Sequence, residues 1–400
     1  MIRTLSYNVR IMHAIYPLSR LHLLIPFSLP TLANEHHVFQ NLNKPALNSL
    51  IERATLVERV VGNDIQRSLP HEKWVASCFD ISHAPTTSKL VQILGNAVSN
   101  RLEDPTAADI DVPIAPYMLL ADGGEPRDAV WMCVEPIHLQ VTQTHLLLSD
   151  PNILQLSTDN AIELLSVARP LIEELGIELE APTPLRWYLS GEQLGLLASA
   201  TPLQAARHNI ENWLSNETYT SHWPRTWIKL QNEVQMAWFN HPVNQAREEC
   251  GLLSVNSIWP YAQGRIMPVT RPFEYVLSRS AAIRGLALAS AAALGVPPVS
   301  FDMLPQQSSL APTCDPSGVV LVELDQLSAP FLQQDWLRFR TVFAVMEHDW
   351  FAPALAALKR YELSELTLTL CGDTIATTLA IRPIEMKKFW RRRAFTSLLL

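Results

Sequence analysis

The feature that most constrains the fold is a short apolar run from Leu21 to Leu29, which contains Pro26 and is followed by Pro30. It is too short to span a bilayer as a helix, which takes about 18 apolar residues, and no run of that length occurs in the chain. Proline is tolerated at the borders and edges of strands. The run therefore predicts a buried strand near the start of the chain.

Three further apolar runs have the length of buried strands, at residues 114–121, 319–324 and 366–370. The middle of the chain shows shorter strand patterns, and apolar residues spaced three and four apart predict helices between the strands. This order predicts an α/β core sheet flanked by helices and interrupted by a smaller α+β domain. The middle strands are expected at 131–134 and 139–148, with a hairpin of 186–189 and 194–198. Helices are expected at 45–61, 159–175, 223–240, 279–294 and 335–361.

Composition narrows the class of protein. Four hundred residues exceed what one hydrophobic core usually organises, so two domains are expected. The net charge of -8 argues against nucleic acid as a partner, because nucleic-acid binding usually requires a basic face. Five cysteines without a Cys-x-x-Cys pair fit neither a disulfide framework nor a zinc site. We expect a cytoplasmic protein with no membrane partner.

A polar segment between residues 241 and 265 carries the candidate binding residues. Histidine, asparagine and arginine side chains recur there beside two glycines, and the arginine fork suits phosphate or carboxylate. The pattern predicts an anion site; in the alternative, the same groups hold the two domains together through buried ion pairs and hydrogen bonds. The candidates are His241, Asn244, Arg247, Asn256 and Arg265, together with Arg284 farther along the chain.

The same segment resembles the archaeal-type cofactor-independent phosphoglycerate mutases of the alkaline-phosphatase superfamily, in His241-Pro242-Val243-Asn244 followed by Arg247 and Gly251. A closer similarity is to a bacterial branch, the RpfE-type regulatory proteins, which share the patterns at 21–27, 131–139 and 241–244. The resemblance implies an alkaline-phosphatase-like core at residues 20–130 and 256–395 and an inserted cap domain at 131–255. It also implies that the native chain begins at Met12.

The metal and nucleophile motifs of the mutases are altered at every matching place. The first strand ends without a carboxylate, and His71 and Glu72 stand where a Ser-Asp pair is expected. The segment from Glu323 to Leu327 has acids but no histidine after them, and Thr374 replaces the histidine of a Gly-Asp-His motif. The resemblance therefore implies no catalytic residues, no metal site and no cofactor.

These observations predict a non-catalytic, phosphoglycerate-mutase-like regulatory protein, a pseudoenzyme. It would bind an anionic, phosphorylated or carboxylated metabolite between core and cap, or a protein partner. One alternative is an active metal-dependent mutase or phosphotransferase with displaced ligands at His71, Glu72, Asp325 and Asp373. Another is a protein-interaction scaffold that uses the basic and aromatic segment 387–393. The simpler prediction for that segment is a C-terminal helix that packs Phe389 and Trp390 on the core.

Overall fold

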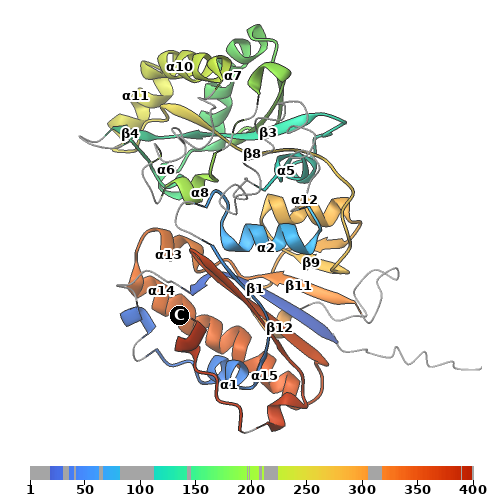
Figure 1. Cartoon of the computed structure of the whole chain (residues 1–400). Coiled ribbons are helices and arrows are strands. Elements are labelled where there is room, and N and C mark those ends of the chain that lie inside the picture. The colour runs from blue at the N-terminus through green and yellow to red at the C-terminus, as the bar shows by residue number, and fades with distance from the viewer. Residues whose placement is uncertain are drawn as a thin grey trace, which may run out of the picture.

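The computed structural model forms two lobes, each built around its own sheet (Figure 1). We call them the core lobe, at the bottom of the figure, and the cap lobe, at the top. The structure describes residues 19–29, 36–39, 42–62, 66–81, 112–141, 146–195, 197, 199–206, 210, 224–304, 318–388 and 390–398.

The core lobe contains a mixed seven-stranded sheet. Strand β1 lies at its centre and runs parallel to both of its neighbours, β11 and β12. Beyond β12, β13 pairs antiparallel with β12, and β2 pairs antiparallel with β13 at the edge of the sheet. This arrangement confirms the predicted α/β class with a core sheet flanked by helices. The order is β10 (Ala293–Gly295), β9 (Tyr275–Leu277), β11 (Val319–Glu323), β1 (Arg20–Leu29), β12 (Glu365–Gly372), β13 (Ile375–Ile381) and β2 (Thr55–Val61).

Helices cover both faces of this sheet (Figure 1). Alternate residues of β1 point to opposite sides, so Leu23 and Ile25 enter one hydrophobic cluster while Leu24 enters the other. The first cluster packs against α1 (Pro45–Arg53), α13 (Ser328–Leu332), α14 (Trp336–Met346) and α15 (Ala352–Lys359), with the π-helical turn Glu347–Phe351 joining the last two. The second packs against α2 (Pro70–Cys78) and α12 (Ala281–Ala289).

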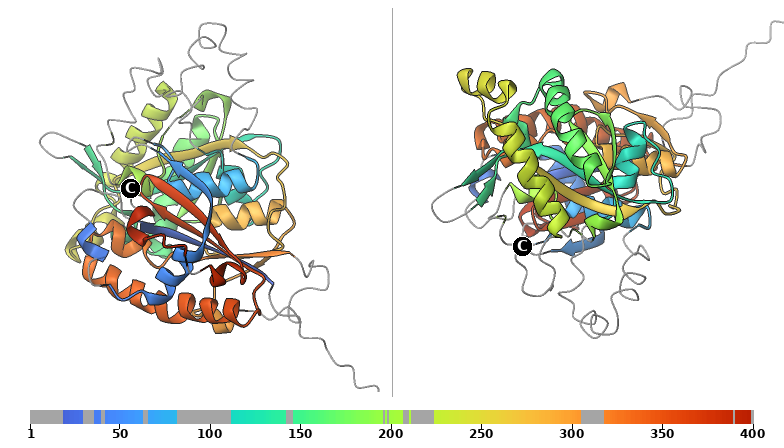
Figure 2. Two further views of the ribbon diagram at one scale, coloured as in Figure 1. Left: turned by 60° about the horizontal axis from the view of Figure 1, so that its bottom comes forward. Right: turned by 90° about the horizontal axis from the view of Figure 1, so that it is seen from above.

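The cap lobe contains an antiparallel four-stranded sheet with helices on its outer face (Figures 1 and 2). The strand order is β6 (Glu178–Thr183), β7 (Arg186–Ser190), β3 (Val130–Ile137) and β8 (Ser257–Arg265). The outer helices are α7 (Thr158–Glu174), α10 (Arg225–Phe239) and α11 (Pro242–Glu249). Smaller elements are the ribbon of β4 (Leu139–Val141) and β5 (Leu146–Leu148), and helices α6 (Pro151–Leu154) and α8 (Pro202–Ala205).

Several predicted elements are wrong in detail. The run at 114–121 forms helix α5 (Ala115–Ala121) with a proline in its first turn, where proline favours helix. The hairpin in the cap pairs β6 with β7 and not with the described part of 194–198; residues 196 and 198 lie outside the described residues. The helix predicted over 45–61 ends at Arg53, and the exposed strand β2 follows. The domain borders stay a prediction; β8, which follows the predicted border at 255, pairs with β3 of the cap sheet.

The two lobes are joined where α5 crosses α12. A Cβ atom added to Gly285 of α12 would lie 1.8 Å from the backbone oxygen of Tyr117 in α5, so only glycine permits this approach. Both helices belong to the second hydrophobic cluster, which reaches from Leu24 of the core sheet to Trp131 of the cap sheet. None of the helices in the described part of the chain is long and apolar enough to cross a membrane.

The C-terminal segment is held against α1 by arginine side chains. One Arg53 nitrogen donates to the backbone oxygens of Lys388, at 2.7 Å, and Arg391, at 2.9 Å. The predicted packing helix is wrong over the described part of 387–393, where Trp390 is largely exposed. Phe395 and Leu398 supply the buried contacts instead, and Phe389 lies outside the described residues.

Candidate functional site

The buried side chains of the polar segment predicted as an anion site form hydrogen bonds within the cap lobe. Asn244 is buried, and its side-chain amide donates to the backbone oxygens of Trp238 and Val255, at 2.8 and 2.9 Å. Its side-chain oxygen accepts the Val255 N–H at 2.7 Å. Asn244 therefore fixes the chain that leads from α11 into β8.

Arg247 is also buried, and its guanidinium group is surrounded by backbone oxygens. Its Nε donates to Leu253 at 2.8 Å, one terminal nitrogen donates to Gln155 at 3.4 Å, and the other donates to Leu154. Main-chain oxygens therefore stand around Arg247 where the sequence analysis expected an anion.

The remaining candidates also have local partners. Asn256 pairs with both backbone groups of Leu139, at 2.7 and 2.9 Å, and the His241 ring accepts the Val243 N–H at the start of α11. The other two are arginines that lie apart from them. Arg265 pairs with Asp128 at 2.5 Å, and Arg284 donates to the Ser278 backbone oxygen at 3.4 Å.

A cavity of about 630 Å³ lies instead at the carboxyl ends of β1 and β11. Its lining residues include members of α2, α8, α12 and α13, helices that lie near the junction of the lobes (Figure 1). In open α/β sheets this edge is where ligands usually bind, and the volume suits a small organic molecule. Its polar lining residues are His71, Glu72, Ser280, Glu323, Asp325, Gln326, Ser328 and Arg338; its apolar ones include Phe27, Val75, Ile114, Leu203, Ile283 and Leu286.

Strand β1 is distorted where it reaches the cavity. The pairing of β1 with β12 shifts register between Ile25 and Leu29, and Phe27 adopts a positive φ of 54°. A positive φ is strained for a bulky residue, and bulges of this kind often direct side chains at functional sites. The distortion places Phe27 in the cavity wall. Its ring packs edge-on against the His71 ring, with the two ring centres 5.5 Å apart.

His71 is the most unusual polar group of the lining. Its Nδ1 is buried and has no hydrogen bond to the part of the chain that the structure describes. Burial lowers the pKa of His71 to about 4, so the ring is neutral at physiological pH. A buried nitrogen without a partner is uncommon and suggests that water or a ligand completes its hydrogen bonding.

Three carboxyl groups share the cavity with His71. Glu323 accepts a hydrogen bond from the Ser278 hydroxyl, and burial raises its pKa to about 7. Burial also raises the pKa of Asp325, an effect that Arg279 partly offsets. Glu72 is committed locally, because its carboxylate accepts the Leu69 N–H at 2.6 Å at the start of α2.

The cavity brings together three of the four displaced ligands considered for an active enzyme: His71, Glu72 and Asp325. Asp373 does not line it. Within the described ranges, no group of three or more His, Cys, Asp or Glu side chains is placed to hold a metal ion. The donor set therefore does not fit the pair of metal ions, about 4 Å apart, that two-metal phosphoryl transfer requires.

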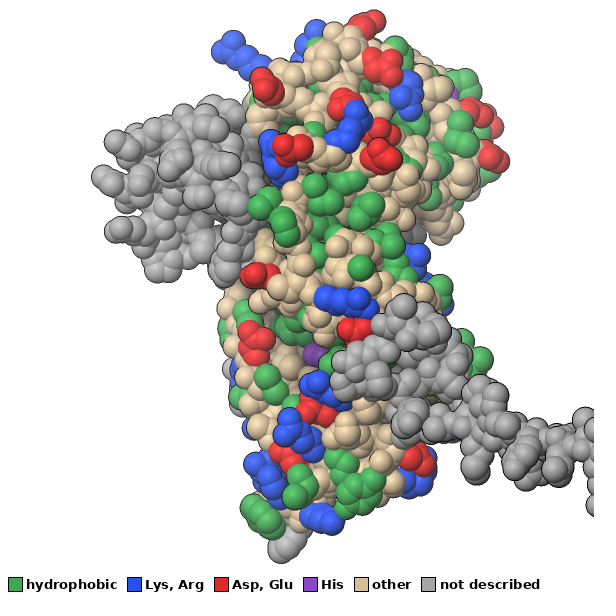
Figure 3. All heavy atoms as spheres, turned by 90° about the vertical axis from the view of Figure 1, so that its right-hand side faces the viewer, with side chains coloured by type: hydrophobic (Ala, Val, Ile, Leu, Met, Phe, Trp, Pro, Cys, Tyr) green, Lys and Arg blue, Asp and Glu red, His purple; other side chains and the backbone are tan. Residues whose placement is uncertain are grey.

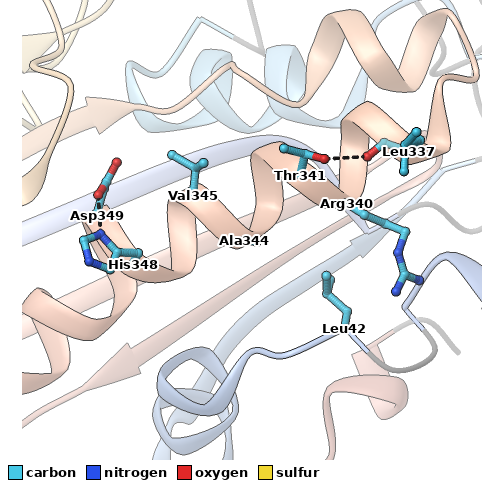
Figure 4. Close-up of a pocket in the computed structure, with 8 residues that line it drawn as sticks. All are labelled: Leu42, Leu337, Arg340, Thr341, Ala344, Val345, His348 and Asp349. Carbon is cyan, nitrogen blue, oxygen red and sulfur yellow. Dashed lines mark hydrogen bonds and ion pairs between the residues drawn. The ribbon is translucent and has the colours of Figure 1, made fainter.

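A second hollow, of about 600 Å³, lies along the exposed side of α14 (Figure 4). It is a weaker candidate because its polar groups are engaged with neighbouring residues. Arg340 donates to the Val38 backbone oxygen at 2.8 Å, and the Nδ1 of His348 lies 2.6 Å from the Asp349 carboxylate oxygen. The remaining lining is mainly aliphatic, including Leu42, Leu337 and Val345.

Cys133 of β3 is buried in the inner face of the cap sheet. Burial raises its pKa well above the usual value, so the thiol is not activated. Nearby, Tyr188 and Arg186 bind the carboxylate of Asp122, at 2.5 and 2.9 Å.

A search of protein-family models and of curated protein sequences finds no match to this chain. Among solved structures, the chain is similar to the PH0037 protein from Pyrococcus horikoshii, with 11% identity, a TM-score of 0.46, and 92% of this chain and 88% of that chain covered. It is also similar to a cofactor-independent phosphoglycerate mutase from Thermoplasma acidophilum, with 13% identity, a TM-score of 0.38, and 91% and 90% of the two chains covered. Neither similarity is close enough to assign a family or an activity.

Proposed function

We propose that the protein is a regulatory small-molecule-binding protein whose ligand occupies the cavity at the carboxyl ends of β1 and β11. The observation that carries the proposal is the orphaned ring nitrogen of His71 in the wall of a cavity of about 630 Å³. Mostly apolar walls with a few convergent polar groups are typical of sites for small organic ligands.

The charges of the lining indicate the kind of ligand. Glu72, Glu323 and Asp325 are acidic, whereas Arg338 is the one basic lysine or arginine among the lining residues. Asp325 has no ion pair or side-chain hydrogen bond to a described residue. A neutral or cationic ligand with a hydrogen-bond donor for Asp325 therefore fits better than the anionic metabolite expected from the sequence.

Binding without turnover is the simpler proposal because two of the three acids are engaged as structural groups. Glu72 caps α2, and Glu323 binds Ser278. Their positions support recognition more than the clamping of two ions around a phosphoryl group.

The rival proposal is a metal-dependent phosphotransferase or mutase. What favours it is that His71, Glu72 and Asp325 line one cavity. Metal analysis of protein purified without chelator separates the two proposals: two bound equivalents of manganese or zinc per chain would favour the rival. So would chelator-sensitive interconversion of 3-phosphoglycerate and 2-phosphoglycerate.

Calorimetric titration of the full chain tests the binding proposal. We expect 1,4-diaminobutane to bind and 3-phosphoglycerate to bind more weakly. Asp325→Asn should remove diamine binding, whereas Asp128→Asn, which alters an exposed acid of the cap lobe, should leave it unchanged. Binding of 3-phosphoglycerate that is tighter than that of the diamine would contradict the assigned ligand charge.

A further inference from the structure

The lower end of the core lobe exposes three large side chains from separate turns. Tyr361 follows α15, Ile384 precedes the turn Glu385–Lys387, and Trp390 lies in the C-terminal segment. Their exposed fractions are 62%, 65% and 66%. Single exposed apolar residues are ordinary, but several at one end of a molecule usually mark an interaction surface.

These turns are neighbours in space. The ammonium group of Lys387 lies 5.6 Å from the centre of the Tyr361 ring, and its backbone N–H donates to the Ile384 oxygen at 3.3 Å. The turn that carries Trp390 follows directly and is closed by the Arg391 N–H, which donates to the Lys388 oxygen at 3.1 Å. The three side chains, with the basic residues between them, are called the basal patch.

The basal patch is firmly held by the core. Besides the two bonds from Arg53, Arg391 donates to the Thr55 hydroxyl at 3.0 Å and Arg393 donates to the Ala54 oxygen. Phe395 is buried beneath this segment. Binding by the patch would therefore require little ordering of the chain, which preserves affinity.

The basal patch is basic in a protein that is acidic overall. Residues 359–365 and 382–393 contain eight lysines and arginines against three glutamates, a net charge of +5 compared with -8 for the whole chain. Lys359, Lys387 and Arg392 have no ion pair with any residue in the described ranges. Figure 3 shows basic and hydrophobic side chains side by side at this narrow end.

We propose that the basal patch docks the protein on the surface of an anionic lipid bilayer. Tryptophan and tyrosine favour the interface between headgroups and acyl chains, and lysine and arginine attract anionic headgroups. A bilayer fits better than a protein partner because the apolar groups project singly from a tapering end. This differs from the expectation of no membrane partner, and it requires no membrane-spanning helix.

Co-sedimentation of the full chain with vesicles tests the proposal. Vesicles of phosphatidylcholine alone are compared with vesicles that contain one quarter phosphatidylglycerol, at low and high salt. We expect binding only to the anionic vesicles, with loss at high salt. Trp390→Ala should weaken binding, and each charge reversal, Lys387→Glu or Arg392→Glu, should weaken it by at least about five-fold.

The cap lobe provides a matched control on α10. Phe239 is 75% exposed there and lies on the same helix as Arg225 and Lys229. Phe239→Ala and the double variant Arg225→Glu/Lys229→Glu should bind vesicles like the wild type. Absence of binding to anionic vesicles at low salt, or equal losses in the control variants, would overturn the proposal. Circular dichroism checks that each variant is folded.

Discussion

Asn244 and Val255 exchange two hydrogen bonds, one from the Asn244 amide to the Val255 oxygen and one from the Val255 N–H to the Asn244 side-chain oxygen. The side chain thus pairs with the backbone as a neighbouring strand would, 11 residues away along the chain. It sets the position from which β8 starts beside β3.

Replacing Asn244 should therefore destabilise the protein. Asn244→Ala leaves three buried backbone groups without their partner, and we expect a loss of about 3 kcal/mol in the free energy of unfolding. Urea denaturation measures it. Gln245→Ala, at the next and exposed position, should change stability by less than about 0.5 kcal/mol. Comparable losses in both variants would contradict the assigned role.

Arg247 should behave as a structural residue and not as a ligand-binding one. We expect Arg247→Ala to lower the unfolding free energy by about 3 kcal/mol, because the backbone oxygens of Leu154, Gln155 and Leu253 lose their donor. Arg247→Lys should cost less, since one ammonium group can still donate. A variant of unchanged stability with lost binding of 3-phosphoglycerate would restore the anion site predicted from sequence.

Gly285→Ala tests the junction of the lobes. Alanine favours helix over glycine by about 1 kcal/mol, so an uncrowded site would become more stable. The added Cβ would meet the Tyr117 oxygen, and we expect a net loss of about 2 kcal/mol or more in thermal or urea unfolding. Leu288→Ala, at a half-exposed position of the same helix, serves as the control.

Glu323 should make the protein less stable as the pH rises. Its pKa is about 7 in the folded chain and near 4.5 when unfolded, so between these values the native state retains a proton that the unfolded state has lost. The free energy of unfolding should fall by up to about 3 kcal/mol over this window. Glu323→Gln should remove that part of the slope in urea titrations between pH 5 and 7.5. An unchanged slope would contradict the assignment.

His71 should act in the opposite direction. Its pKa is about 4 in the folded chain against 6.5 when unfolded, so below pH 6.5 protonation favours the unfolded state. Its contribution is complete above pH 6.5 and is lost as the pH falls towards 4, by up to about 3 kcal/mol. His71→Asn should flatten the acid limb of the stability curve. Measuring it beside Glu323→Gln separates the two opposing effects.

Much of the fold could be predicted where local pattern and tertiary packing agree. The apolar spacing at 159–175 locates α7, and the buried run at 319–324 locates β11. The run at 114–121 could not be resolved, because a short buried helix and a buried strand have the same apolar composition. The place of β8 depends on its pairing with β3, which no local pattern encodes.

The candidate site was only partly predictable. His71, Glu72 and Asp325 stand out as residues at altered motif positions, but nothing local shows that Phe27, Ser280 and Glu323 meet them. The polar residues at 241–265 suggested an anion site because their types suit one. In the fold, the side chains of Asn244, Arg247 and Asn256 form hydrogen bonds with main-chain groups of the cap lobe instead.

Strand β2 ends the core sheet with all seven residues exposed, among them Val57 and Val61. An apolar free edge of this kind invites the addition of further strands and hence aggregation. Glu58 and Arg59 at its centre oppose this. When two copies pair parallel and in register, each of these residues lies beside its own counterpart, and like charges side by side repel. The two charges thus help to prevent the β2 strands of separate copies from pairing with each other.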